Sequence, residues 1–335
     1  MPITSRFDAG QALTVSVANR QSAIQDIVYN ATPLTRILRD QGRIKVKRAG
    51  GPELRIPVMF DKLEAQWFTG YDIINITPKE LLNSAIFNWS RVVAPFSLNG
   101  TELLYNSGPE EFIDLAATYL DAAEMSAKEA FEEGLVSDGT GDGGRQMQGL
   151  GVAVPLVVNA GVYGSIDRGT VAEWRTSEYD ISSGDVTGFT TWDSTTARAI
   201  VSAVSLARSR NGRYPDLWIF DSVMWPAVEA SFVAHQRFAS ERLARLGFSG
   251  LTYMTAAGPV DLVAAGGIGN VMPASTAFGI DTKGLAIYEF PGQSFVPFHP
   301  GNGLRPINQD AVAQGIVWSG QLVLENPLFT VRVTV

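Results

Sequence analysis

The segment SDGTGDGGRQMQGLG, residues 137–151, contains the residue types of two kinds of ligand-binding loop. Three glycines have the G-x-G-x-x-G spacing of a dinucleotide loop, in which backbone N–H groups approach a pyrophosphate: Gly139, Gly141 and Gly144. Two aspartates and a glycine have the spacing of a calcium loop of the EF-hand type: Asp138, Asp142 and Gly143. The segment therefore indicates a nucleotide site, a calcium site or a loop without a ligand.

The surrounding sequence argues against both ligands. A dinucleotide loop follows a strand and opens a helix, whereas here a long predicted helix comes first and no helix is predicted after it. A calcium loop needs a carboxylate at its twelfth position, which is Gly149, and Thr140 stands at its third. We interpret the segment as a loop that binds neither ligand, and we predict no cofactor and no metal.

The sequence contains no recognisable set of catalytic residues elsewhere. His235 falls on an apolar helix face and His299 falls in a turn, and the motifs G-x-S-x-G, H-E-x-x-H and G-x-x-x-x-G-K-[ST] do not occur. The chain has no Cys, which excludes disulfides, thiolate nucleophiles and cysteine-based zinc sites. Adjacent acids such as Glu132 and Glu133 could serve as acid and base, but nothing places them across a cleft. We therefore predict no catalytic residues and no enzyme.

Composition bounds the class of protein. The 335 residues are enough for two subdomains, and a net charge of -8 is unfavourable for a dedicated nucleic-acid binder. Charged residues make up only 18% beside 45% hydrophobic residues, which suggests surface buried against other subunits. The N-terminus lacks the basic region and apolar run of a signal peptide, so we expect a cytoplasmic chain. The sequence also lacks the apolar stretch of about 20 residues that a transmembrane helix needs, so we expect no membrane role.

Hydrophobic periodicity predicts a mixture of helices and strands. Residues 1–42 are predicted to form an arm with an amphipathic stretch, and residues 43–48 and 53–60 a β-hairpin around the turn at 49–52. Pro109 and the acids after it open a helix at 109–133, which Gly134 ends. The remaining predicted elements are a strand at 85–97, helices at 194–212 and 222–239, a buried strand at 217–220, short strands between 251 and 297, and two strands at 315–335 joined at Asn326 and Pro327.

The predicted hairpin suggests contacts between subunits. Its apolar stripe includes Leu54, Ile56, Val58 and Phe60, and because a two-stranded ribbon alone is marginal in water, we expect it to pack on a neighbouring subunit. Trp, Tyr and Arg often anchor interfaces. A solvated basic face and core packing of the aromatic residues are the alternative interpretations. The candidate contact residues are Arg43, Lys45, Lys47, Arg48, Arg55, Lys62, Trp67, Phe68, Tyr71, Glu132, Glu133, Arg168, Trp174 and Arg175.

The order of these parts resembles the major capsid protein of tailed double-stranded DNA phages. The resemblance covers nearly the whole chain and is carried by four stretches: FNWSRVVAPFSLNGTELLYNSG, DGTGDGGRQMQGL, YGSIDRGTVAEWR and GQLVLENPLF. It implies an α+β fold of the HK97 type. The implied parts are an N-arm at 1–40, an E-loop hairpin with flanking strands at 41–93, a P-domain at 94–190 and 311–335 with its spine helix at 109–133, and an α/β A-domain at 191–310.

The resemblance also implies a function and partners. Such a chain forms pentamers and hexamers of an icosahedral shell that encloses DNA without sequence-specific contact, in a virion assembled in the bacterial cytoplasm. Its expected partners are copies of itself, a separate scaffolding protein, a portal and, in some members, cement proteins. Some members crosslink subunits through an E-loop Lys, for which Lys62 is the candidate, but no partner Asn can be named and we predict no crosslink. The alternatives are an encapsulin-like nanocompartment shell, and a carboxylate-dependent hydrolase or sugar-binding module.

Overall fold

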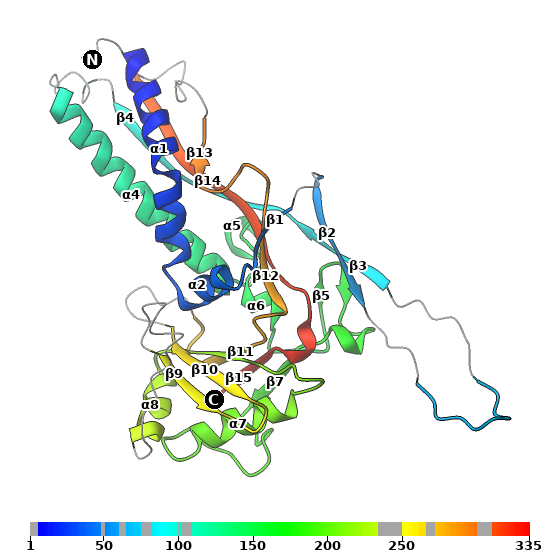
Figure 1. The fold of residues 1–335 in the computed structure, drawn as a ribbon. Helices are drawn as coiled ribbons and strands as arrows, with labels where there is room; N and C mark the ends of the chain where they lie inside the picture. Colours follow the sequence, from blue (N-terminus) through cyan, green and yellow to red (C-terminus); the bar gives the residue numbers. More distant parts are fainter. Residues whose placement is uncertain are drawn as a thin grey trace. The chain divides into compact units, whose positions relative to one another are not determined.

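A computed structural model describes most of the chain, and Figure 1 shows its ribbon. The described residues are 6–47, 51–59, 65–74, 82–99, 101, 109–233, 250–265, 272–299 and 310–335. They belong to two compact units. The first unit takes its residues from 1–50, 89–149 and 287–322, and the second from 51–88, 150–286 and 323–335. The boundaries of the four predicted parts remain a prediction.

The first unit is built on one long helix and one long antiparallel strand pair. Helix α4, Pro109–Val136, packs on strand β4, Ser90–Asn99, and on helix α1, Arg6–Tyr29. β4 pairs antiparallel with β14, Ala311–Leu324, from Asn99 opposite Ala311 to Ser90 opposite Gly320. The same sheet contains β1 (Ile44–Val46), β12 (Leu285–Glu289) and β13 (Val296–Pro297). A short helix, α2 (Pro33–Asp40), is capped by the Thr32 side chain.

An aromatic cluster forms the core of this unit around a buried carboxylate. The Phe131 ring meets Tyr29 and Trp318 edge to face, with centroid distances of 5.6 and 4.9 Å. The Glu289 carboxylate accepts hydrogen bonds from the Tyr29 hydroxyl, from Trp318 Nε1 at 3.0 Å and from Ser294 Oγ at 2.7 Å. These three donors explain how a carboxylate can be buried among aromatic rings, because buried polar groups need hydrogen-bond partners.

The second unit contains a six-stranded sheet in the order β7-β15-β11-β8-β10-β9. The strands are β7 (Ser177–Asp180), β8 (Leu217–Phe220), β9 (Gly250–Met254), β10 (Pro259–Ala264), β11 (Thr276–Ile280) and β15 (Val331–Thr334). Helices α7 (Ala197–Ala207) and α8 (Trp225–Val233) contribute Val201, Val204 and Phe232 to a core that includes Trp218 of β8. The shorter elements of the chain are α5 (Gly141–Gly144), α6 (Leu150–Ala153), β5 (Val162–Tyr163), β6 (Ile166–Asp167), η1 (Ala172–Trp174) and η2 (Pro327–Phe329).

The predicted hairpin of residues 43–48 with 53–60 is wrong. Strand β2, Glu53–Met59, pairs antiparallel with β3, Leu82–Asn88, whereas β1 pairs in parallel with β12. Both alternating stretches do form strands, but they belong to different sheets. Periodicity shows which residues share a face of a strand, and it does not identify the partner strand.

The β2–β3 ribbon is supported inside its own unit, so the premise that its apolar stripe requires a neighbour is wrong, while packing of the ribbon on a neighbouring subunit remains a prediction. The side chains of Leu54, Ile56 and Val58 are buried, while Phe60 lies outside the described residues. On β3, the Phe87 ring packs edge to face on Tyr163 of β5, with centroids 5.0 Å apart. The ribbon's apolar stripe is therefore covered within the second unit, and no other copy is needed to bury it.

Other predicted elements differ in their boundaries or partners. Helix α4 extends past Gly134 to Val136, and the strand predicted at 85–97 is divided between β3 and β4. The two closing strands do not pair with each other, although they follow one another in the sequence: β14 pairs with β4 and β13, while β15 pairs with β11 and β7. The buried strand at 217–220 and the helix beginning at Pro109 are confirmed. A short helix, α6, begins at Leu150 near the end of the glycine-rich segment, where no helix was predicted.

A glycine substitution tests the support of the ribbon. A Cβ added at Gly164 would lie 2.7 Å from Phe87 Cζ and 3.0 Å from Ala85 Cβ, and φ is +59° there. Gly161 also has a positive φ, +84°, but a Cβ at that position would meet nothing within 4 Å. We expect Gly164→Ala to lower the free energy of unfolding by about 2–4 kcal/mol and Gly161→Ala by about 1 kcal/mol. Urea unfolding of the two variants measures the difference, and equal losses would contradict this packing.

Candidate functional site

The most exposed apolar side chains of the described residues lie in residues 65–74, the aromatic segment, between β2 and β3. Trp67 and Tyr71 are fully exposed, at 103% and 104%, and Ile73 is 96% exposed. The segment turns at a local contact, in which the Asp72 carboxylate accepts from Thr69 N at 2.8 Å and Thr69 Oγ1 at 3.1 Å. These hydrogen bonds lower the pKa of Asp72. Large exposed apolar side chains that cluster in one segment are typical of interaction sites.

The structure places the predicted contact residues of this segment at the surface. Phe68, between Trp67 and Thr69, is 62% exposed, so all three predicted aromatic residues are accessible to a partner. Met59 at the end of β2 and Leu82 at the start of β3 are also exposed. Sequence reasoning did not identify Met59, Ile73 or Leu82. Their position beside an exposed aromatic cluster was the only signal that could have indicated them.

The predicted basic contact residues are divided between the two units. Arg43, Lys45 and Lys47 lie on or beside β1 of the first unit, whereas Arg55 lies on β2 of the second. Lys45 Nζ is 3.3 Å from the Tyr288 hydroxyl, and Arg55 forms a 3.1 Å ion pair with Glu53. These basic residues therefore do not surround one hairpin, and their role in contacts between subunits remains a prediction. Arg48, Lys62 and His235 lie outside the described residues.

Arg168 and Trp174 have a packing role in place of the predicted surface role. Each side chain is only 2% exposed. Arg168 Nη2 donates to the carbonyl oxygens of Val152 and Ala153 at 2.9 and 2.7 Å, and its guanidinium carbon lies 4.9 Å from the centroid of the Tyr163 ring. Trp174 Nε1 donates to Tyr163 O at 2.9 Å. A side chain buried in its own unit does not present a contact surface.

Arg175 and Tyr163 complete this buried cluster. The half-buried Arg175 side chain donates to the carbonyl oxygens of Arg168 and Gly169. The Tyr163 hydroxyl accepts from Leu324 N at 3.0 Å, and burial raises the pKa of Tyr163 to about 12. The cluster therefore fixes the path of the chain around β5, β6 and η1.

The glycine-rich segment after α4 is held by its own side chains. Ser137 Oγ donates to Gln146 Oε1 at 2.6 Å, and Gln146 Nε2 donates to Glu133 Oε1 at 3.1 Å. The Asp138 carboxylate accepts from both N and Oγ1 of Thr140, which lowers the pKa of Asp138. The glycines allow close approach to the helix, since a Cβ at position 149 would lie 2.3 Å from Gly134 O. These contacts explain the segment's composition by packing.

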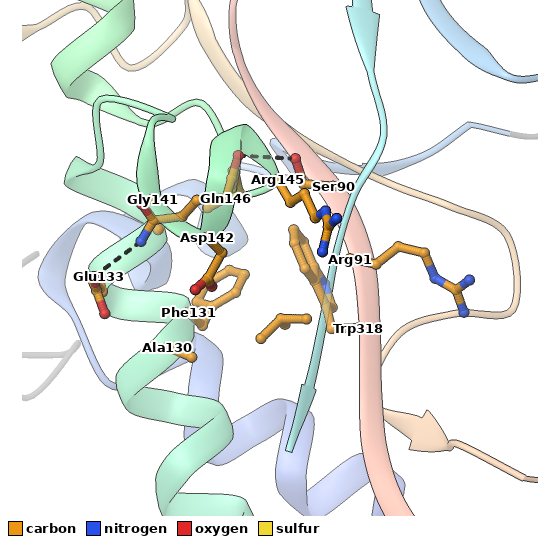
Figure 2. Close-up of a pocket in the computed structure, with 13 residues that line it drawn as sticks. Ser90, Arg91, Ala130, Phe131, Glu133, Gly141, Asp142, Arg145, Gln146 and Trp318 are labelled. Atoms are coloured by element: carbon orange, nitrogen blue, oxygen red, sulfur yellow. Dashed lines mark hydrogen bonds between the residues drawn. The ribbon is translucent and has the colours of Figure 1, made fainter. Parts of the chain in front are cut away.

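A cavity of about 640 Å³ lies between the end of α4, the start of β4, the glycine-rich segment and β14 (Figure 2). Phe131 and Trp318 line it and are themselves buried, while the exposed side chains of Arg91 and Arg145 also line it. The Ser90 hydroxyl is 3.1 Å from Gln321 Oε1 and 3.4 Å from Gln146 O. No His or Lys side chain lines this cavity, so it offers aromatic and guanidinium surface for binding and no nucleophile with an adjacent base.

The two acids at the end of α4 differ in environment. Glu132 is half-buried, and burial raises the pKa of its carboxyl group, opposed by nearby Lys128. Glu133 is exposed and lines the cavity, where it accepts the hydrogen bond from Gln146. Carboxylates are unfavourable at the negative end of a helix dipole. Their predicted role in contacts between subunits remains a prediction.

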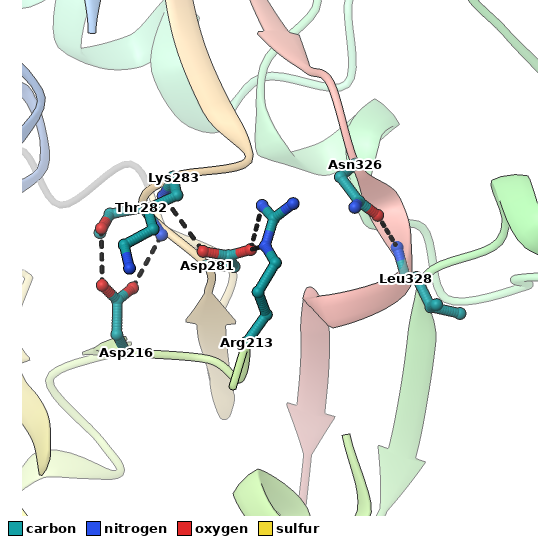
Figure 3. Close-up of polar contacts among 7 residues, drawn as sticks. All are labelled: Arg213, Asp216, Asp281, Thr282, Lys283, Asn326 and Leu328. Atoms are coloured by element: carbon teal, nitrogen blue, oxygen red, sulfur yellow. Dashed lines mark hydrogen bonds and ion pairs between the residues drawn. The ribbon is translucent and has the colours of Figure 1, made fainter. Parts of the chain in front are cut away.

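A second group of carboxylates fastens the ends of β8 and β11 (Figure 3). The Asp281 carboxylate forms an ion pair with Arg213 at 2.5 Å and accepts from Lys283 N at 3.1 Å. The Asp216 carboxylate accepts from N and Oγ1 of Thr282, both at 2.7 Å. These acids are engaged in structural hydrogen bonds and are poorly placed for acid–base chemistry. Among the described ranges, no group of three potential metal ligands is found, and no helix has the length and apolarity to cross a bilayer.

Comparison with solved structures assigns the fold. The capsid asymmetric unit of cyanophage A-1(L) matches with a TM-score of 0.62 and 15% sequence identity, covering 88% of this chain and 90% of that one. The capsid of Myoviridae phage XM1 matches with a TM-score of 0.50 and 11% identity, covering 89% and 91%. No protein-family model and no curated protein matches the chain. The predicted α+β fold of the HK97 capsid type is therefore confirmed over the 88% of the chain that matches.

The buried Tyr163 predicts a loss of stability at alkaline pH. Its folded pKa of about 12 lies above the ordinary value of 10.0, so folding favours the protonated phenol. The stability that this group contributes is complete below pH 10 and is lost as the pH rises toward 12, by about 2–3 kcal/mol in total. Urea unfolding across this interval measures the slope. Tyr163→Phe should flatten the slope, while costing about 1–3 kcal/mol at neutral pH through the unpaired Leu324 N–H. Equal slopes in both proteins would contradict the prediction.

Proposed function

We propose that the chain is the major capsid protein of a tailed double-stranded DNA phage. In this role it assembles as pentamers and hexamers into an icosahedral shell, and its location is the virion capsid. The observation that carries the proposal is the match of almost the whole chain to a phage capsid subunit, with a TM-score of 0.62. The function requires no catalytic centre, cofactor or metal.

The exposed surface supports self-assembly. A subunit of a closed shell must bury large complementary surfaces against its neighbours, and segments that reach neighbouring copies raise avidity. The aromatic segment offers Trp67, Phe68 and Tyr71 to such a neighbour, since all three are exposed. Trp and Tyr are frequent anchors of protein interfaces. We therefore assign this segment to the contacts between copies, together with the exposed Arg55 and Glu133.

The remaining partners follow from the proposed role. A shell of this kind needs a scaffolding protein and a portal during assembly, and cement proteins can bind its outside. The net charge of -8 suits a container for DNA, because strong cationic contacts would hold the phosphates of the packaged genome. Assembly takes place in the bacterial cytoplasm.

Two alternatives make different predictions. An encapsulin-like nanocompartment would have the same fold but would enclose a cargo enzyme in place of DNA, so the contents of purified particles separate the two. A carboxylate-dependent hydrolase or sugar-binding module would be a small oligomer that loses function when one or two acids are replaced. The cavity beside α4 does not favour an enzyme, because the exposed Glu133 and Asp142 that line it have no organised nucleophile beside them.

Substitutions in the aromatic segment test the assembly role. We expect Trp67→Ala with Tyr71→Ala to block shell formation, because truncating two interface anchors costs about 2–4 kcal/mol each at every copy of the contact. The subunit should stay folded, since both side chains are fully exposed. Sedimentation velocity of protein expressed with its scaffolding protein measures assembly, and circular dichroism checks folding.

Met125→Ala provides the control for this prediction. Met125 is an exposed apolar residue of α4, at 64% exposure, and lies outside the segment. This variant should sediment as shells, like the wild type. If the double variant forms normal shells with unchanged particle size and yield, the aromatic segment is not part of the interface.

A further inference from the structure

We propose that the second unit contains a binding site for a small oxyanion, such as inorganic phosphate, beside Arg332. The site lies on the six-stranded sheet, where the last strand of the chain, β15, pairs in parallel with β7. The proposal concerns a ligand of the folded chain and is independent of the role of the chain in a shell. A test of the site therefore leaves the proposed function unaffected.

Arg332 carries a buried guanidinium group without a polar partner. The residue is only 8% exposed, and its side chain makes no hydrogen bond or ion pair with any described residue. Its guanidinium carbon lies 5.5 Å from the centroid of the Phe278 ring of β11, a cation–π contact that leaves the N–H donors unused. Burial lowers the pKa of Arg332, opposed by the charge of Glu178. A buried charge of this kind is costly unless it has a partner, so it indicates an anionic ligand.

Two threonine hydroxyls belong to the same site. Thr176 and Thr330 are 3% and 0% exposed, and neither hydroxyl oxygen has a hydrogen-bond partner. Five buried side-chain atoms of the described residues lack a partner, and three of them are Thr176 Oγ1, Thr330 Oγ1 and Arg332 Nε. Buried polar atoms are normally hydrogen-bonded. Three exceptions on two neighbouring strands therefore point to a ligand that all three contact.

The strand register places these side chains on one face of the sheet. Val331 lies opposite Ser177, and Ser177 N donates to Thr330 O at 3.2 Å. Val331 belongs to the core that α7 and α8 cover, so Thr330 and Arg332 face the other side, because side chains alternate along a strand. Thr176 precedes Ser177 and lies beside Thr330 on that side. Neighbouring strands are about 5 Å apart and alternate residues about 7 Å, which the long Arg332 side chain can span.

The chemistry of the three groups favours an oxyanion over a neutral ligand. A guanidinium offers N–H donors and no acceptor, and it forms paired hydrogen bonds with the oxygens of phosphate. Two hydroxyls supply further donors. The half-buried Glu178 lies opposite Arg332 but forms no ion pair with it, and its Oε1 accepts from Thr334 Oγ1 at 3.0 Å. The buried positive charge is therefore only partly compensated. Because Arg332 is almost completely buried, the ligand must be a free ion and not a group on a macromolecule.

An anion at this site would connect two strands from distant parts of the chain. β7 and β15 meet only in the folded state, so the anion binds the folded chain and not the unfolded one. Such a ligand stabilises the folded state in proportion to its concentration above the dissociation constant. We expect a dissociation constant on the order of 1 mM for phosphate, at which 100 mM phosphate lowers the equilibrium constant of unfolding about 100-fold.

Urea unfolding of the full chain in phosphate, in sulfate and in sodium chloride of equal ionic strength tests the site. Arg332→Met removes the guanidinium and should fold, because an apolar residue in place of a buried charge is often tolerated. Thr330→Val removes one hydroxyl at nearly constant shape and serves as a second variant. Arg145→Met is the matched control, because Arg145 is exposed and also makes no hydrogen bond or ion pair with a described residue.

The site requires different responses from these proteins. The wild type and Arg145→Met should show the 100-fold effect of phosphate, Arg332→Met should show none, and Thr330→Val should lose at least about tenfold of it. Sulfate should act like phosphate, since both present the same tetrahedral oxygens. An equal effect in all four proteins would overturn the site, because phosphate and sulfate also stabilise proteins generally by exclusion from their surface. A wild-type chain that is no more stable in phosphate than in sodium chloride would overturn it as well.

Discussion

The antiparallel pairing of β4 with β14 is the contact on which the rest of the first unit depends. It runs without interruption over ten residue pairs and joins residues 90–99 to residues 311–320, which are more than 200 positions apart in the sequence. Helix α4 packs directly on β4, and Trp318 of β14 joins Phe131 of α4 in the aromatic core. The same three elements form walls of the cavity. Loss of this pairing would therefore disrupt the aromatic core, the cavity and the surface on which α1 packs.

Local sequence signals predicted the elements that depend on local chemistry. The helix that begins at Pro109 and the apolar strand at 217–220 were both predicted from short stretches. The alternation in residues 53–59 identified a strand and the face that it buries, as the burial of every second residue shows. These features follow from backbone periodicity and end effects, which are encoded within a few residues.

Features that depend on distant residues could not be predicted in this way. The partner of β2 is β3, which follows after a long connection, and an alternating stretch at 43–48 offered an equally plausible partner. Arg168 and Trp174 have the residue types of an interface, yet burial by their own unit decides their role. The cavity combines residues from 90–92, 130–134, 141–147 and Trp318, which no sequence window contains. The family resemblance predicted the fold because the order of many weak motifs is more specific than any one of them.

Assembly into closed shells is the central property that we propose for this chain. The most direct measurement is negative-stain electron microscopy of the purified wild-type chain, alone and co-expressed with its scaffolding protein, after sizing by light scattering. We expect closed shells or rings of five and six subunits. A homogeneous monomer under all of these conditions would contradict it, and would return attention to the carboxylates beside α4 as a site for small molecules.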